Sequence, residues 1–229
     1  MRTVVFDLDG TLADTSADLI CAANACFAAR GLGDLLHRTD DALIAFHGGR
    51  AMLQAGYSRH GWQGAQLEDA IAQDYAALLQ YYDANICQHT TLYPGAYAAV
   101  QTLRDTGYKT AICTNKPEGL ARTLVDQLGI ADLFDALIGA DTLPTRKPDP
   151  QPYIAAVQGA GGSVQQSFLI GDTDTDRRTA AAVDVPSVLV TFGPTGQDIL
   201  RLAPDAALHS YAQLPALTAQ LLGTPAHGK

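Results

Sequence analysis

The sequence is poor in cysteine and in basic residues, and each shortage excludes a class of protein. Its four cysteines form no CxxC pair and accompany no histidine-rich ligand cluster, so we expect reduced, mostly buried thiols in a cytoplasmic protein. Lysine and arginine total 15 against 24 acidic residues. The resulting net charge of −9 argues against nucleic acid as a partner, because nucleic-acid binding needs a basic face.

Long hydrophobic runs are also missing. No apolar run reaches the ~18 residues typical of a membrane span, so a membrane partner is not expected. The N-terminus carries one arginine and then a short strand-like run, which is unlike a signal peptide. The 229 residues are 47% hydrophobic and 17% charged, as in ordinary globular proteins, and allow one large domain or a core plus a smaller domain.

The first predicted strand is separated from all later strands by a helical block. Val4 to Asp7 is a short apolar run ending at a polar turn, which is typical of a buried parallel strand. Between Ser16 and about Cys87 no comparable run appears, and helical patterns alternate with glycine-bearing breaks. The predicted helices of this block are Ala17 to Ala29, Asp40 to Phe46, Arg50 to Ala55 and Leu67 to Cys87.

From Leu92 onward, predicted helices and strands alternate strictly. The helices are Pro94 to Gly107, Pro117 to Leu128, Pro150 to Ala160 and Asp174 to Val183; the strands are Tyr108 to Thr114, Phe134 to Ala140, Ser167 to Gly171 and Val185 to Thr191, before a weak final strand and helix. This pattern predicts an α/β fold with a doubly wound, Rossmann-like parallel sheet covered by helices on both faces. We expect a core of residues 1–14 and 93–229, carrying a small inserted α-helical domain of residues 15–92.

Polar motifs follow the first four predicted core strands, and the third of these motifs lies in the loop after its strand. These motifs are D-L-D-G-T (Asp7 to Thr11), T-N-K-P (Thr114 to Pro117), R-K-P-D-P (Arg146 to Pro150) and G-D-T-D-T-D (Gly171 to Asp176). Because ligands of open α/β sheets bind at the carboxyl ends of the strands, we expect the four motifs to form one site.

In this order, the four motifs resemble the signature of the haloacid dehalogenase-like superfamily. The helical insertion after the first motif is similar to the small helical cap of some members, and the layout is most similar to the phosphoglycolate phosphatase group. The resemblance implies a Mg²⁺-dependent phosphatase that hydrolyses a small phosphate monoester, phosphoglycolate-like or a sugar phosphate, through an aspartyl-phosphate intermediate.

The residue types suit this chemistry. A carboxylate can attack a phosphoryl group to give an acyl phosphate that water cleaves, so Asp7, last on its strand, is the candidate nucleophile. Asp9 can protonate the leaving alcohol and then deprotonate the attacking water. The expected Mg²⁺ ligands are the Asp7 carboxylate, the Asp9 backbone carbonyl and Asp172, with Asp176 beside them. Lys147 supplies a fixed positive charge between the nucleophile and the phosphoryl group.

Two residues of the second motif are candidates for substrate binding. The Thr114 hydroxyl and nearby backbone N–H groups can hold phosphoryl oxygens at a helix N-terminus, where Pro117 fits the first helical position. Asn115 is expected to position either the turn at Thr114 or Asp7 itself.

Arg50 is the substrate-binding candidate in the insertion. The resemblance implies that a glycine-bearing cap turn faces the active site and helps to select the substrate, and Arg50 follows the turn H-G-G, although His47 stands where glycine is usual. A solvated arginine at the start of a helix is the alternative interpretation, and both stay open.

Several other residues have structural explanations. Asp174 is expected to cap the following helix rather than to bind metal, and Lys116 and Arg146 are expected in solvent. Trp62 is expected to anchor packing within the insertion. Asp184 stands where the family more often has glycine, and aspartate tolerates the left-handed backbone that such a turn needs.

Two related chemistries are excluded and two alternatives remain. Asp9 argues against haloacid dehalogenation, which needs no acid at that position, and the absence of lysine between Thr15 and Leu92 argues against phosphonate cleavage through a cap Schiff base. The alternatives are β-phosphoglucomutase-like phosphoryl transfer and a non-hydrolytic phospho-accepting signalling module. The expected partner is a small-molecule phosphate ester, bound by a monomer or a homodimer, and the natural substrate is left open.

Overall fold

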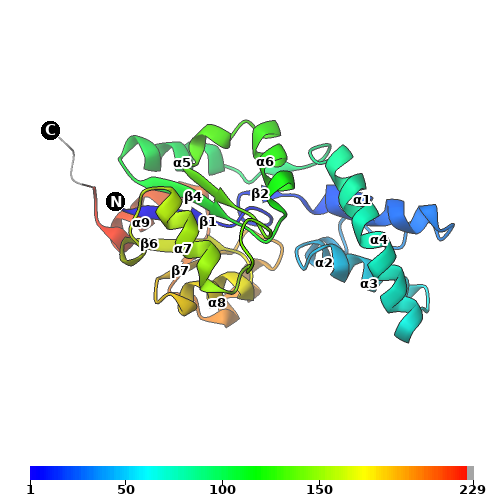
Figure 1. Cartoon of the computed structure of the whole chain (residues 1–229). Helices are drawn as coiled ribbons and strands as arrows, with labels where there is room; N and C mark the ends of the chain where they lie inside the picture. Colours follow the sequence, from blue (N-terminus) through cyan, green and yellow to red (C-terminus); the bar gives the residue numbers. More distant parts are fainter. Residues whose placement is uncertain (226–229) are drawn as a thin grey trace. The chain divides into compact units, whose positions relative to one another are not determined.

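A six-stranded parallel sheet lies at the centre of the larger of two compact units in the computed structural model, which describes residues 1–225 (Figure 1). This unit comprises Met1–Ala13 and the chain from Leu92 onward. The strands lie in the order β5-β4-β1-β6-β7-β8. Their bounds are Thr3–Phe6 for β1, Lys109–Cys113 for β4, Ala136–Ile138 for β5, Ser167–Gly171 for β6, Ser187–Val190 for β7 and Ala206–Leu208 for β8. The predicted α/β fold is confirmed.

Strand β1 occupies a central position, and all four of its residues are buried. It pairs in parallel with β4 and β6, so that Val5 lies opposite both Ala111 and Leu169. The chain proceeds from β1 to β4 and β5 on one side, and then crosses to β6, β7 and β8 on the other. The strand order therefore reverses between β1 and β6, which is the point where open α/β sheets bind their ligands.

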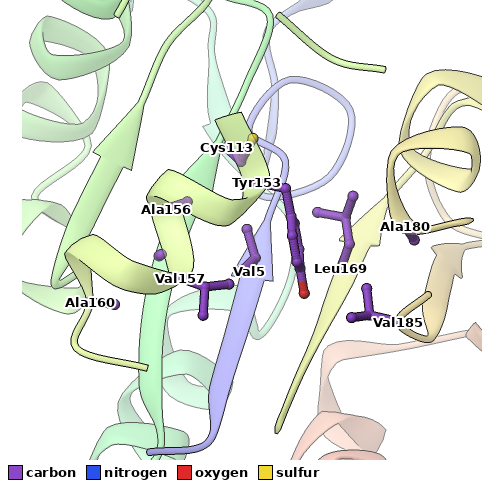
Figure 2. Close-up of a cluster of buried hydrophobic side chains, with 10 residues drawn as sticks. Val5, Cys113, Tyr153, Ala156, Val157, Ala160, Leu169, Ala180 and Val185 are labelled. Atoms are coloured by element: carbon purple, nitrogen blue, oxygen red, sulfur yellow. The ribbon is translucent and has the colours of Figure 1, made fainter. Parts of the chain in front are cut away.

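Helices cover both faces of this sheet. Tyr153 of helix α7 packs with Val5 and Leu169 on one face, where Ala180 of α8 joins the same buried cluster (Figure 2). Val4 and Phe6 alternate with Val5, point to the opposite face and are also buried. The helices of this unit are α5 (Ala96–Asp105), α6 (Glu118–Gln127), α7 (Pro150–Gly159), α8 (Asp174–Ala182) and α9 (Leu214–Leu222).

The second unit, Asp14–Thr91, is built mainly of helices. They are α1 (Ser16–Ala29), α2 (Ala42–Ala45), α3 (Gly49–Arg59) and α4 (Gly64–Ala84). The rings of Phe27 and Tyr57 pack edge to face with their centroids 4.9 Å apart, and the ring of Trp62 stacks on that of Tyr57 with a centroid distance of 4.7 Å. Trp62 is therefore a packing residue, as predicted. Gly56 permits this contact, since a Cβ there would lie 2.1 Å from the Phe27 ring.

Two short strands, β2 (Ala13–Asp14) and β3 (Thr91–Leu92), pair with each other where the chain passes between the two units. None of the helices in the described part of the chain is long and apolar enough to cross a bilayer. All four cysteines are free thiols, and Cys26 and Cys113 are buried.

The predicted elements are present with shifted ends. Strand β6 matches its predicted range residue for residue. The helix predicted from Pro94 begins at Ala96, and the helix predicted from Pro117 begins at Glu118. Pro117 is the N-cap residue of that helix, and not its first helical residue, because its backbone is still extended at ψ 138°. Asp184 has φ 54°, which confirms the left-handed turn predicted there.

Candidate active site

The end of β1 places Asp7 at the reversal of strand order. Its backbone N–H donates to the carbonyl of Ile170 at 2.8 Å, so the residue is tied to β6. Its side chain is buried, with 8% of the residue exposed, and Oδ1 lies 3.0 Å from Nζ of Lys147. The backbone thus holds this carboxylate at the edge of the sheet where the sequence motifs were expected to meet.

Three buried carboxylates meet at this point. Asp7, Asp172 after β6 and Asp176 in the first turn of α8 each place one carboxylate oxygen within 4.8 Å of the others. Oδ2 of Asp172 is buried and has no hydrogen-bond partner among the residues that the structure describes. Like charges at such distances repel strongly when they are buried, so the arrangement calls for a cation beside the orphaned oxygen.

Gly10 keeps the space beside that oxygen open. Its φ of 79° lies in the left-handed region that favours glycine. A Cβ at this position would lie 2.3 Å from Oδ2 of Asp172. Any larger residue would therefore displace the carboxylate, which gives the glycine of the first motif a second physical reason.

The other oxygen of Asp172 accepts a hydrogen bond from Thr11, which is itself held by Tyr211. The hydroxyl of Thr11 donates to Oδ1 of Asp172 at 3.0 Å, and the hydroxyl of Tyr211 donates to the Thr11 carbonyl at 2.8 Å. Tyr211 is buried and its ring packs 5.2 Å from that of Phe192. Sequence reasoning missed Tyr211, because it lies 200 residues from Thr11 and follows no strand-end motif.

Asp176 caps helix α8 and holds Lys147. Its Oδ2 accepts from the N–H of Thr173 at 3.1 Å and its Oδ1 accepts from Nζ of Lys147 at 2.6 Å. The prediction that Asp174 caps this helix is wrong: Thr173 is the N-cap residue and Asp174 is the first helical residue. Thr173 and Asp176 cap the helix reciprocally as a capping box, while the Asp174 side chain is exposed and lies 3.7 Å from Arg178.

Lys147 bridges two of the carboxylates. Its side chain is only 2% exposed, and Nζ lies within ion-pair distance of both Asp7 and Asp176. Burial alone would lower the pKa of Lys147, but Asp176 and Asp7 outweigh burial and raise the pKa above its usual range. The side chain is therefore a permanent ammonium within the cluster.

The carboxylates of the cluster carry more negative charge than Lys147 compensates. Burial raises the pKa of Asp7 to about 6, with Lys147 opposing and Asp176 adding to the shift. The pKa of Asp172 is also raised well above its usual value, first by burial and then by Asp7 and Asp176. Both shifts have the direction expected for carboxylates that require a further positive charge in order to ionise together.

The second motif brings Thr114 and Asn115 to the same edge of the sheet. The backbone N–H of Thr114 donates to the carbonyl of Ile138 at 2.9 Å, and its buried hydroxyl accepts from the N–H of Lys116 at 3.2 Å. Asn115 donates from Nδ2 to the backbone carbonyl of Lys147 at 3.0 Å. This hydrogen bond is to the third motif, and not to either of the two positions expected.

Lys116 corrects one prediction. It was expected in solvent, but its side chain is 4% exposed and Nζ lies 2.7 Å from Oδ1 of Asp9. The reason is the direction of the loop after β4, which turns this side chain inward. A signal was present in the sequence, since Lys116 lies in the strand-end motif T-N-K-P, but the motif does not show which way a loop side chain points. Arg146 is exposed, as predicted.

Arg50 belongs to the second unit, where it lies in the first turn of α3. Its guanidinium lies over the ring of Tyr75, 4.6 Å from the ring centre, and the residue is exposed. This is a cation–π contact between α3 and α4. The expectation that Arg50 binds substrate stays a prediction.

Several known proteins are similar to this chain over most of its length. A phosphoglycolate phosphatase from Caulobacter vibrioides is 36% identical over 221 residues, covering 96% of this chain and 92% of the relative. A phosphoglycolate phosphatase from Agrobacterium fabrum is 36% identical over 220 residues, covering 95% and 93%. The crystal structure of a predicted phosphoglycolate phosphatase from Haemophilus somnus 129pt superposes with a TM-score of 0.83, at 24% identity, over 95% of this chain and 98% of that one.

The family model for haloacid dehalogenase-like hydrolases matches residues 4–190. That range begins on β1 and ends on β7, and contains all four strand-end motifs. The chain therefore belongs to the haloacid dehalogenase-like hydrolase family.

Proposed function

We propose that this hydrolase is a Mg²⁺-dependent phosphatase that cleaves a small phosphate monoester through an aspartyl-phosphate intermediate. The observation that carries the proposal is the buried cluster of Asp7, Asp172 and Asp176. One oxygen of Asp172 has no hydrogen-bond partner within residues 1–225, and the buried ammonium of Lys147 lies 3.0 Å from Asp7. The names of the relatives support phosphoglycolate as the type of substrate.

The residues present fit a magnesium ion. Hard oxygen donors come from Oδ2 of Asp172 and from the nearby Asp7 carboxylate. Gly10 has no side chain that would fill the space beside Oδ2 of Asp172. We infer that Asp7, the backbone carbonyl of Asp9 and Asp172 hold the ion, with Asp176 beside them. When bound, Mg²⁺ neutralises the negative charge of the phosphoryl oxygens and of the carboxylates.

In the first half of the reaction, a carboxylate oxygen of Asp7 attacks phosphorus as the bond from phosphorus to the ester oxygen breaks. Asp9 gives its proton to the departing ester oxygen, so the alcohol leaves neutral. Lys147 keeps its positive charge beside Asp7 throughout and reduces repulsion between the carboxylate and the phosphate dianion. The Thr114 hydroxyl and the N-terminus of α6 orient the phosphoryl oxygens.

In the second half, water attacks the phosphorus of the aspartyl phosphate and gives a proton to Asp9. The bond from phosphorus to the Asp7 oxygen breaks, which releases inorganic phosphate and restores the Asp7 carboxylate and the protonated Asp9.

The remaining predicted residues have supporting roles. We assign Asn115 to holding the loop of Lys147, because its side chain donates to the Lys147 carbonyl. Arg50 is assigned to substrate selection, and the four free cysteines support a reducing, cytoplasmic setting.

A panel of phosphorylated metabolites with Mg²⁺ tests the proposal. We expect many turnovers on at least one small monoester, and Asp7→Asn to reduce kcat by about 10³-fold or more while the protein still folds. Asp174→Asn is the matched control, since that aspartate is exposed on α8 outside the cluster. Full turnover by Asp7→Asn would remove Asp7 from its role, and labelling that stops after one event would indicate a phospho-accepting module instead of a phosphatase.

A further inference from the structure

Lys116 is a buried ammonium that the proposed chemistry does not use. Its Nζ lies 2.7 Å from Oδ1 of Asp9, and its side chain is 4% exposed against 18% for that of Asp9. A buried cation costs free energy unless an acidic group lies beside it. The ammonium of Lys116 is therefore held next to Asp9.

The backbone fixes Lys116 at two points. Its N–H donates to the hydroxyl of Thr114 at 3.2 Å, and its carbonyl accepts from the N–H of Ala140 at 2.9 Å. These contacts tie the residue to the ends of β4 and β5. The ammonium is therefore held at the edge of the sheet from which the proposed acid, Asp9, also projects.

This placement brings Lys116 close to the part of the substrate that leaves. The ester oxygen that takes a proton from Asp9 must come within about 3 Å of that carboxylate. Because Nζ of Lys116 lies 2.7 Å from Oδ1 of Asp9, the ammonium is then at most about 8 Å from the ester oxygen. In the phosphate ester of an α-hydroxy acid, the carboxylate begins two bonds from the ester oxygen and extends about 3 Å from it, so an ammonium–carboxylate contact is within reach.

Lys147 gives an example in this site of one lysine that contacts two carboxylates. Its ammonium bridges Asp7 and Asp176. An ammonium has three N–H donors and can hold two carboxylates at once. We infer that Lys116 bridges Asp9 and a carboxylate of the leaving group, and so selects phosphate monoesters of α-hydroxy acids over esters of neutral alcohols. This inference rests on the proposed phosphatase activity and names the residue that reads the leaving group.

The test compares two substrates of similar size: 2-phosphoglycolate, whose leaving group carries a carboxylate, and 2-hydroxyethyl phosphate, whose leaving group is neutral. We expect the wild-type protein to show a kcat/KM at least about 10² higher for 2-phosphoglycolate, and Lys116→Met to lower that preference by about 10²-fold, mainly through KM. Lys116→Arg keeps the charge and should retain most of the preference. Lys109→Met is the control, because Lys109 pairs with Asp135 away from the carboxylate cluster and should leave both substrates unchanged.

Two results would overturn the inference. The first is a wild-type protein that hydrolyses both substrates with equal efficiency. The second is a Lys116→Met variant that loses the same factor on both, which would show that Lys116 acts only through Asp9. If circular dichroism shows that Lys116→Met does not fold, the test uses Lys116→Gln instead. Its ratio of kcat/KM values for the two substrates is then compared with the ratio of the wild-type protein. Failure of the proposed function is distinguishable, because the wild-type protein would then hydrolyse neither substrate nor any other monoester.

Discussion

Thr11 donates a hydrogen bond of 3.0 Å to one oxygen of Asp172, while the other oxygen of that carboxylate is buried without a partner among the described residues. The hydrogen bond fixes the rotation of the carboxylate about its side chain. The free oxygen is consequently presented to Asp7 and Asp176, where the proposed Mg²⁺ would be held. Thr11 is in turn held at its carbonyl by the hydroxyl of Tyr211.

Tyr211→Phe should weaken divalent metal binding by about 2- to 10-fold, because it removes the hydrogen bond that holds the Thr11 carbonyl and keeps the packed ring. The affinity can be measured by calorimetric titration with Mg²⁺ or by the electron paramagnetic resonance of Mn²⁺. Tyr153→Phe is the matched control, since Tyr153 is equally buried but its hydroxyl pairs with Ser167 in the core. Equal metal affinities in both variants would show that Tyr211 has no part in positioning Asp172.

Lys147→Met should destabilise the metal-free protein by about 3–5 kcal/mol, because it leaves Asp7 and Asp176 buried without their shared cation. Urea unfolding monitored by circular dichroism measures this free energy. Lys109→Met, which breaks a partly exposed pair with Asp135, should cost only about 0–1 kcal/mol. A similar loss in the two variants would contradict the assignment of Lys147 as the cation that compensates the cluster.

The stabilisation that Mg²⁺ provides should increase with pH. The pKa of Asp7 is raised to about 6 by burial, so the folded, metal-free protein binds this proton more tightly than the unfolded chain does. Its contribution to stability is therefore greatest at low pH and is lost as the pH rises from about 4 to about 6. Bound Mg²⁺ favours the ionised carboxylate and offsets that loss.

The measurement is the increase in Tm on adding MgCl₂ at a series of pH values. We expect a small increase at pH 5 and a larger one, reaching a plateau, above pH 6–7. Comparing the protein with and without Mg²⁺ at each pH cancels the opposite contributions of carboxylates whose pKa is lowered, such as Asp135. An increase in Tm that is independent of pH would contradict metal binding by Asp7.

Arg50→Ala should raise KM selectively for the natural substrate, if Arg50 selects substrate as proposed. About 10-fold is expected for the loss of one charge-assisted contact. Tyr75→Phe is the comparison variant, because it keeps the ring under the guanidinium and removes only the hydroxyl. An equal effect of Arg50→Ala on every substrate, or none, would return Arg50 to the role of a solvated helix residue.

Local sequence patterns predict most of the fold. Short apolar runs such as Ser167–Gly171, bounded by glycine and by charged turns, identify buried parallel strands because both faces of such strands must be apolar. The right-handed winding of alternating strands and helices then brings the strand ends to one edge. For this reason the sequence predicts that Asp7, Lys147 and Asp172 meet at that edge, and the structure places Asp7 beside both Lys147 and Asp172.

Side-chain direction in loops, and contacts between distant segments, were decided only by the tertiary structure. Lys116 follows β4 in a turn whose sequence predicts a solvated lysine, and only the tertiary structure shows that its side chain is buried beside the carboxylate of Asp9. Tyr211 reaches Thr11 from 200 residues away. The sequence alone determined which strands form and which chemical groups stand at their ends, because those depend on local periodicity. Which of these groups pair, and which oxygen is left free for a cation, depends on packing between segments that no local pattern describes.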